Sequence, residues 1–477
     1  MANELGITIK KEEDMPEWYS QVVIKSELGD YSAVRGCAVI RPLGYSLWQS
    51  IVDYFNARLN KLKVQNAYFP MFIPESFFYK EAEHVEGFAP EVAWISKTSD
   101  TEERLAIRPT SETIMYDSYS KWIRSHRDLP LRINQWANIV RWEISDVKIF
   151  LRSREFLWQE GHCVYATEKE CEKETLMMLK EYAKMSEDLL AIPAIIGKKS
   201  EREKFPGAKT TYTFEAFMPD GKALQSGTSH NLGQGFGKAF NIKFQGEDGQ
   251  EHLPWQSSWG FSTRLLGAVV MVHGDDKGLV LPPKMAPNKV VIVPITSKDS
   301  EKVLIEAKKL AKQLTKFNVY LDDRFDKSPG FKFNEWELKG VPLRIEIGPK
   351  DLEKHSCVIV SRYNGEKKEV KLTEVKKYVD LKLKQIQKDM LEIARAKVEA
   401  KKVFVINYDD FTKAITERKL VLAHHCGNKD CEDEIKAETG GATTRCRPMK
   451  ADKPEIGAKC VHCDKKAKYK IYFAKNY

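Results

Sequence analysis

Apolar residues recur at the spacing of a helix early in the chain, between residues 45 and 62. Leu47, Ile51 and Phe55 fall on one side of a 3.6-residue period, which predicts an amphipathic helix. The next segment, "NAYFPMFIP" at residues 66–74, is predicted to form a strand that its prolines stop, because proline cannot donate to a strand ladder. A helix followed by a strand therefore opens the first folded unit.

The middle of the chain follows the two-residue period of strands. Residues 136–143 and 154–162 are predicted to pair as an antiparallel hairpin across a polar loop. A long helix is predicted over residues 168–190, and residues 211–259 then alternate as strands separated by glycine-containing turns. With an apolar helix over residues 261–273, the pattern predicts an antiparallel sheet packed against helices.

Prolines in residues 281–289, "LPPKMAPNK", predict a linker. Beyond the linker, strands are predicted at 290–295, 318–323, 342–348 and 355–362, and helices at 302–317, 331–339 and 373–402. This alternation over a stretch of domain size predicts an α/β module with its own core. A lysine-rich tail at residues 403–477 follows. We therefore expect three domains, over residues 1–283, 284–400 and 401–477.

The hairpin carries an unusual mixture of charged and aromatic side chains. On a two-residue period, one face of the second strand holds Arg152, Arg154, Phe156, Trp158, Glu160 and His162, while Arg141 and Glu143 share a face of the first. Arginines on a sheet floor are suited to holding phosphates through paired charge-assisted hydrogen bonds. The alternative is a network of ion pairs on a solvated sheet face, and the hairpin alone favours that alternative.

Three further stretches carry polar chemistry. Residues 108–113, "RPTSET", have the form of a helix start, with Thr110 or Ser111 as the capping residue. Residues 224–233, "LQSGTSHNLG", gather hydroxyl, amide and imidazole groups in a segment that could simply turn. Residues 258–267, "SWGFSTRLLG", place an arginine beside small residues, where an ordinary surface arginine is the alternative.

Composition and charge narrow the class of protein. The chain has 477 residues, of which 42% are hydrophobic and 30% charged, as in soluble globular proteins of several domains. No apolar run is long enough to cross a bilayer, and residues 1–18 contain no signal-peptide core, so we expect a cytoplasmic protein without a membrane partner. The net charge of +9 is compatible with a nucleic-acid partner without proving one.

Five of the nine cysteines lie in the tail, where two close pairs indicate a metal site. Cys426 and Cys431 belong to "CGNKDC", and Cys460 and Cys463 to "CVHC". In a reducing compartment such pairs favour tetrahedral zinc over disulfides, although ordinary free thiols are the alternative. Possible substitute ligands are Cys446, His424, His425 and His462.

The ordered set of motifs resembles one enzyme family. "RPTSET", "NQWANIVRWE", "FLWQEGH", "QSGTSHNLGQ" and "WGFSTR" are together similar to the prolyl-tRNA synthetases, class II aminoacyl-tRNA synthetases, in their archaeal and eukaryotic-type branch. The resemblance implies an α+β catalytic domain with an antiparallel sheet of the class II synthetase fold, an α/β anticodon-binding domain and a small zinc-binding α/β C-terminal domain. It also implies a homodimer that joins L-proline to tRNA(Pro) through a prolyl-adenylate.

The resemblance assigns roles to individual residues. For ATP, which would be accompanied by Mg²⁺, it implies Arg141, Glu143, Arg152, Gln225, Thr228, Ser262 and Arg264, with Arg141 at the α-phosphate and Arg264 at the γ-phosphate as the two catalytic residues. For proline it implies Thr110, Glu112, Arg141, Trp158, His162, His230 and Phe88, with Glu112 and Thr110 accepting from the ammonium. It supports a structural zinc on Cys426, Cys431, Cys460 and Cys463.

Some relatives carry an editing insertion between the motifs, and residues 163–224 are too few to hold one. We therefore expect that the purified chain does not hydrolyse alanyl-tRNA(Pro). Two alternatives to the main interpretation stay open at this point. One is a related class II synthetase for another small amino acid, and the other is a non-catalytic RNA-binding or regulatory paralogue.

Overall fold

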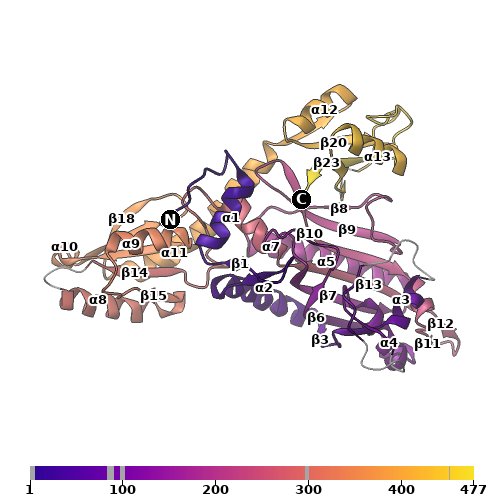
Figure 1. Cartoon of the computed structure of the whole chain (residues 1–477), viewed down its shortest axis with the longest axis horizontal. Coiled ribbons are helices and arrows are strands. Elements are labelled where there is room, and N and C mark those ends of the chain that lie inside the picture. Colours follow the sequence, from indigo (N-terminus) through magenta and orange to yellow (C-terminus); the bar gives the residue numbers. More distant parts are fainter. Residues whose placement is uncertain (1–5, 83–90, 97–102, 296–299, 451) are drawn as a thin grey trace.

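The structure, a computed structural model, describes residues 6–82, 91–96, 103–295, 300–450 and 452–477. A large antiparallel sheet dominates the N-terminal part (Figure 1). Its strands are β3 (Gln65–Asn66), β6 (Leu131–Val140), β7 (Glu155–Tyr165), β8 (Ile195–Lys198), β9 (Thr210–Phe217), β10 (Lys222–Gly233) and β13 (Trp255–Ser262). The order β10-β13-β7-β6 is antiparallel throughout, as the two-residue period of these segments predicts.

Helices and short hairpins surround this sheet. The helices are α1 (Met15–Lys25), α2 (Pro42–Lys61), α3 (Glu75–Ala82), α4 (Glu112–Trp122), α5 (Glu168–Asp188), α6 (Gly235–Ala239) and α7 (Arg264–His273), with a 3₁₀ turn at His126–Asp128. The short strands are β1 (Gly29–Tyr31), β2 (Ala38–Ile40), β4 (Phe72–Pro74), β5 (Leu105–Ile107), β11 (Phe244–Gln245) and β12 (Glu251–His252). Helix α5 begins at a capping box formed by Thr167 and Glu170, and its buried face packs on β10 and β13.

Aromatic side chains form the core between α2, α5 and the sheet. The Phe55, Tyr182 and Phe261 rings meet with centroids 5.2–5.3 Å apart, and Phe261 lies nearly perpendicular to the other two. Gly161 on β7 has to be a glycine because a Cβ there would lie 2.2 Å from the Trp259 ring. This core holds β7 and β13 rigidly from behind, which leaves their other face for a site.

The second part has a five-stranded sheet with its own core. Its strands are β14 (Val290–Pro294), β15 (Val319–Leu321), β16 (Leu343–Ile347), β17 (Ser356–Ser361) and β18 (Lys367–Lys371). Its helices are α8 (Ser300–Gln313), α9 (Pro329–Leu338), α10 (Pro349–Glu353) and α11 (Val375–Glu399), with a 3₁₀ turn at Thr315–Phe317. Strand β14 pairs in parallel with β15 and β16, as expected where helices connect the strands. The predicted α/β module is therefore confirmed.

The third part extends the sheet of the first. It contains β19 (Lys402–Val405), α12 (Tyr408–Thr416), β20 (Leu420–His425), α13 (Lys429–Glu438), β21 (Ala442–Thr444), β22 (Arg447–Pro448) and β23 (Tyr469–Asn476). Strand β23 pairs in parallel with the start of β10, and β22 pairs with β8. In Figure 1 this part lies against the β8–β10 side of the sheet. The predicted α+β and α/β classes are confirmed, and one sheet runs through the first and third parts.

Two local predictions differ from the structure. The predicted strand at 66–74 is two short pieces, β3 and β4, because Pro70 lies between them and has no N–H for a ladder. The hairpin strands are shifted, since β6 ends at Val140 and β7 starts at Glu155. Among the residues that the structure describes, no helix combines the length and the apolar character needed to cross a membrane.

Candidate functional site

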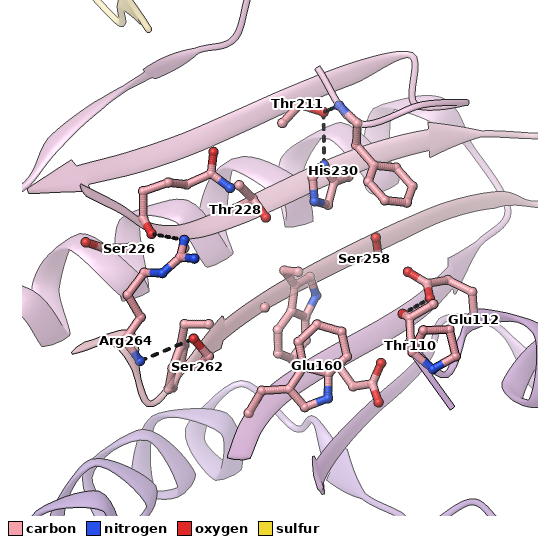
Figure 2. Close-up of a pocket in the computed structure, with 18 of the residues that line it drawn as sticks. Thr110, Glu112, Glu160, Thr211, Ser226, Thr228, His230, Ser258, Ser262 and Arg264 are labelled. Carbon is pink, nitrogen blue, oxygen red and sulfur yellow. Dashed lines mark hydrogen bonds between the residues drawn. The ribbon is translucent and has the colours of Figure 1, made fainter. Parts of the chain in front are cut away.

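A cavity of about 500 Å³ opens on the face of the sheet opposite the aromatic core (Figure 2). Its floor comes from β7, β10 and β13, and its rim from the start of α4, the residues after β6, and the segment 199–206. Figure 2 shows Arg264 and Ser262 at one end and Thr110 and Glu112 at the other. The cavity therefore has a basic end and an acidic end.

Strand register brings the floor residues together. His230 on β10 is paired with Ser258 on β13, and Ser258 is paired with His162 on β7. Closer to the basic end, Ser262 is paired with Trp158. Directly paired residues have Cβ atoms about 5 Å apart, so groups distant in sequence share one surface.

A β-bulge in β10 changes which side chains of that strand face the cavity. The pairing of β10 with β9 shifts between Gln225 and Gly227, so Ser226 is an extra residue on that strand. A regular strand would turn Gln225 and Thr228 to opposite faces, but with the extra residue both line the cavity. The bulge gives the site one more polar side chain than the two-residue period allows.

The centre of the floor holds a fully buried carboxylate. Glu160 accepts hydrogen bonds from the Ser111 hydroxyl and from Gln135 Nε2 at 3.0 Å, and its Oε2 lies 3.1 Å from His162 Nε2. Burial favours the neutral carboxyl, but these hydrogen bonds outweigh it and keep the pKa of Glu160 below its ordinary value. Burial lowers the pKa of His162, yet the hydrogen bond to Glu160 and the charge of Glu112 raise it overall. Within the pair, Glu160 therefore favours the carboxylate and His162 takes up a proton more readily than an ordinary histidine.

The predicted helix start at "RPTSET" also contributes side chains to the site. Ser111 is the N-cap residue of α4, but its side chain makes no capping bond and donates to Glu160 instead. The Thr110 hydroxyl donates to the carboxylate of Glu112, which is also buried. The Thr110 and Ser111 hydroxyl protons are used in these two hydrogen bonds. At the acidic end, the groups left to face the cavity are therefore hydrogen-bond acceptors.

His230 is held as a neutral imidazole. Burial, and then the nearby charges of His162 and Lys199, lower its pKa to about 3. The Phe205 N–H donates to Thr211 Oγ1 at 3.0 Å, and Thr211 Oγ1 lies 2.9 Å from His230 Nδ1. A hydroxyl can take part in two hydrogen bonds at once, so Thr211 Oγ1 links the Phe205 backbone to His230 Nδ1.

Two arginines form the basic end. The Arg264 guanidinium donates to the backbone oxygens of Gln225 and Leu151 at 3.3 and 3.4 Å. Burial and then the charge of Arg141 lower the pKa of Arg264 to about 10, so it stays protonated at neutral pH. Arg141 faces the cavity with its guanidinium 5.7 Å from the Phe156 ring centroid, and within the described residues no hydrogen bond or ion pair uses that guanidinium. The protein atoms around Arg141 partly desolvate its guanidinium and lower its pKa, although the residue is exposed at the cavity. Two close, incompletely paired guanidinium groups are suited to an anionic ligand.

Most predicted site residues meet in this cavity. Those that line it are Thr110, Glu112, Arg141, Glu143, Trp158, His162, Gln225, Thr228, His230, Ser262 and Arg264. Arg152 is exposed and is not among the lining residues, and Phe88 lies outside the described residues. The prediction that Arg154 shares the cavity face of the strand is wrong. Its guanidinium donates to backbone oxygens of Ile144 and Arg35, because the strand begins only at residue 155.

Sequence reasoning missed several lining residues. They include Lys199, Glu203, Phe205, Thr211, Ser226 and Ser258. Ser258 could have been found, because it is four residues before Ser262 on the same strand face. The segment 199–206 has no regular period and matches no motif, so only the fold places it at the rim.

Behind the rim, Glu215 on β9 is fully buried between two cations. Lys199 Nζ lies 2.8 Å from its Oε1 and Arg445 Nη2 lies 2.9 Å from its Oε2. Burial raises the pKa of this carboxyl, but the charges of Arg445 and Lys199 outweigh it and bring the pKa to about 2. Glu215 is therefore ionised at neutral pH.

The low pKa of Glu215 predicts a pH-dependent contribution to stability. A lowered pKa stabilises the fold above the ordinary value of 4.5, by about 3 kcal/mol, and this is lost as pH falls from about 4.5 to about 2. Glu215→Gln should therefore lower Tm at pH 6 and lower it by less at pH 3, because the contribution is already partly lost there although Glu215 is still mostly ionised in the folded protein. Calorimetry of both proteins measures the difference, and an equal Tm gap at both pH values would contradict it.

A second cluster lies in the third part, around four cysteines. The Sγ atoms of Cys426 and Cys463 are 3.6 Å apart, and those of Cys431 and Cys460 are 3.8 Å apart. His425 also offers a ring nitrogen within 4.8 Å of the thiols of Cys426, Cys431 and Cys460. Tetrahedral zinc with Zn–S bonds of about 2.3 Å requires Sγ–Sγ separations of about 3.8 Å. The two thiol pairs have this spacing, but the group whose ligand atoms all lie within 4.8 Å of one another consists of His425, Cys426, Cys431 and Cys460, and Cys463 is close only to Cys426.

Comparison with known proteins gives consistent matches along the chain. Residues 94–273 match the tRNA synthetase class II core domain (G, H, P, S and T), residues 289–381 an anticodon binding domain, and residues 408–477 the prolyl-tRNA synthetase C-terminal domain. The proline–tRNA ligase of Alkaliphilus oremlandii is 50% identical over 471 residues, which cover 98% of this chain and 97% of that protein.

Two eukaryotic proteins are also similar. The cytoplasmic proline–tRNA ligase of Arabidopsis thaliana is 45% identical over 486 residues, covering 99% of this chain and 91% of that protein. The crystal structure of prolyl-tRNA synthetase from Cryptosporidium parvum, complexed with halofuginone and AMPPNP, superposes with a TM-score of 0.93 at 43% identity. That match covers 100% of this chain and 98% of the other.

Proposed function

The chain belongs to the prolyl-tRNA synthetase family, and from this premise we propose how its cavity divides the reaction among its residues. The enzyme attaches L-proline to tRNA(Pro) at the expense of ATP in two steps. First, the proline carboxylate attacks the α-phosphorus, which releases pyrophosphate and forms prolyl-adenylate. The 3′-terminal hydroxyl of the tRNA then attacks the prolyl carbonyl, and AMP leaves.

We assign the basic end of the cavity to ATP. A carboxylate is already a nucleophile, so the first step needs alignment and neutralisation of phosphate charge more than a strong base. Arg141 would hold the α-phosphate and the nearby proline carboxylate, and Arg264 the γ-phosphate. Mg²⁺ accompanies ATP in class II synthetases and neutralises part of its charge. The observation that carries this assignment is the unpaired guanidinium of Arg141 facing the cavity.

With the ATP phosphates at the basic end of the cavity, we assign its other contacts as follows. Glu143 lines the rim and would accept from the adenine amino group, while Gln225 and Ser262 would contact the nucleotide beside Arg264. Thr228, on the floor between the two ends, would lie where the substrates meet. Arg152 does not line the cavity, but its charge is close enough to lower the pKa of Arg264, and its proposed role stays a contact with the phosphate tail of ATP.

We assign the acidic end to proline. The secondary ammonium of proline has two N–H groups, and the carboxylate of Glu112 and the hydroxyl of Thr110 would accept from them. Trp158, His162 and His230 would enclose the ring, with the buried Glu160–His162 pair fixing the imidazole of His162. A small apolar ring beside charged acceptors accounts for the mixture of aromatic and charged groups on this strand.

Isotope exchange between ATP and pyrophosphate tests this function directly. Exchange should depend on proline when the twenty amino acids are supplied one at a time. Preference for another small amino acid would favour a related synthetase, and no exchange with any would favour a non-catalytic paralogue. The clustering of Arg141, Arg264, Glu112 and His230 in one cavity supports catalysis.

We further propose a structural zinc on Cys426, Cys431, Cys460 and Cys463, whose thiol separations support tetrahedral coordination. His425 is the nearest substitute ligand. Cys446 packs in a separate cluster with Ile195 and Phe217, which argues against a metal role. The zinc would stabilise the fold and take no part in the reaction.

We also propose that the enzyme is a cytoplasmic homodimer, with domain limits at 1–283, 284–400 and 401–477. Exposed apolar side chains on α2 and just before it, among them Val39 and Tyr45, support a subunit interface there. The relative from Arabidopsis is named as cytoplasmic, which supports the location. A molar mass of one chain in light scattering would contradict the dimer.

A further inference from the structure

The rim segment 199–206 lies between the cavity and the C-terminal part of the chain. On the cavity side it contributes Lys199 and Phe205 to the lining. The Phe205 ring packs on His230 with centroids 4.9 Å apart, and the Phe205 N–H bonds to Thr211, which holds His230 Nδ1. Any displacement of this segment would therefore move the imidazole that faces the proline end.

On its other side, the segment is attached to α13 by a buried carboxylate. The Ser200 hydroxyl donates to Glu432 Oε2 at 2.8 Å, and the Thr444 hydroxyl donates to the same oxygen at 2.7 Å. All three side chains are buried, with Glu432 6% exposed and Ser200 2% exposed. Without this buried acceptor the Ser200 and Thr444 hydroxyls, whose oxygens are 3.1 Å apart, could bond only to each other, and the attachment of the segment to α13 would be lost.

A second attachment lies next to the first. Lys199 is bound to Glu215, and Glu215 is bound to Arg445 of the C-terminal part. Strand β8, directly before the segment, pairs with β22, and a Cβ on Gly197 would lie 2.2 Å from the Arg447 carbonyl oxygen. The backbones therefore approach too closely for any other residue at Gly197, which fixes where the segment begins.

We propose that Glu432 is a positioning residue for the proline site, acting from the C-terminal part through Ser200, the segment 199–206 and His230. Glu432 touches neither substrate. Its carboxylate holds the segment so that Phe205 packs on His230 and orients Thr211 toward Nδ1. The inference rests on the proposed role of His230 in enclosing the proline ring, and it gives the C-terminal part a function in amino-acid recognition.

Kinetics of ATP–pyrophosphate exchange with the full-length enzyme test the proposal. Glu432→Ala should raise KM for proline by about tenfold, as expected when a positioned group shifts by a fraction of an ångström, with KM for ATP unchanged. Glu432→Gln keeps an acceptor oxygen for both hydroxyls and should restore most of the proline KM. Rescue by Gln separates positioning from a general loss of structure.

Asp433→Ala is the matched control. Asp433 is the next residue of the same helix and pairs with Arg202 of the same segment, but both side chains are about half exposed, at 51% and 50%. Exposed ion pairs contribute little, so this variant should keep the wild-type KM for proline. If Glu432→Ala fails to fold, Ser200→Ala removes the same contact by a smaller change and should raise the proline KM alone.

The outcomes separate this inference from the proposed function. Wild-type exchange that does not depend on proline would overturn the function itself. Proline-dependent exchange with an unchanged proline KM in folded Glu432→Ala or Ser200→Ala would overturn only the role of Glu432. Equal increases in the KM values for proline and ATP, without rescue by Gln, would also overturn it.

Discussion

Replacing Arg141 with alanine should reduce proline-dependent ATP–pyrophosphate exchange by a factor on the order of 10³ or more while leaving the protein folded. Arginine groups that stabilise charge during phosphoryl transfer are worth effects of this size. The guanidinium of Arg141 contacts the Phe156 ring but has no hydrogen bond or ion pair within the described residues, so its removal should cost little stability. The measurement is kcat/KM for exchange, with circular dichroism as the check on folding.

Two further variants sharpen this prediction. Arg141→Lys keeps the charge but loses the planar pair of donors, so most of the activity should remain lost. Arg127→Ala removes an exposed arginine outside the cavity and should behave as wild type. Full activity of folded Arg141→Ala would remove Arg141 from the reaction.

Loss of zinc should unfold the C-terminal part. Structural zinc sites contribute on the order of 10 kcal/mol through coupled binding and folding, more than the stability of most domains. Cys431→Ser should therefore reduce the zinc content far below one per chain and expose residues beyond 400 to proteolysis. Elemental analysis and limited proteolysis measure the two effects.

Cys446→Ser is the control for that prediction, because Cys446 is buried in the same part of the chain but away from the four thiols. It should keep one zinc per chain. Wild-type protein with well below one zinc per chain would contradict the site. Since β23 pairs with β10, loss of zinc should also weaken proline activation, which links this prediction to the role of Glu432.

The two-residue period of the strands and the family motifs together predicted the central part of the site. The two-residue period correctly placed Trp158, Glu160 and His162 on one face, because β7 is regular from Glu155 onward. The same period was wrong for Arg154, which precedes the strand. Periodicity locates a face only within the strand, and charged residues next to an aromatic run do not reveal where the strand begins.

Features that arise from tertiary contacts could not be predicted from local sequence patterns. The bulge after Gln225 adds a side chain to the cavity, yet nothing in "LQSGTSHNLG" separates a bulge from a regular strand. The pairing of β10 with β23 joins residues near 222 to residues near 475, and local patterns cannot show such a contact. For this reason the tail was predicted as a separate domain, and its contact with the rim segment 199–206 was not foreseen.

A crystal structure with a non-hydrolysable prolyl-adenylate analogue tests the central claim most directly. The ring nitrogen should lie within about 3.2 Å of Glu112 or Thr110, with the group that replaces the phosphate beside Arg141 and the adenine beside Glu143. His230 and Trp158 should enclose the ring. An analogue bound in the reverse direction, with adenine at the Glu112 end, or bound outside this cavity, would contradict the account.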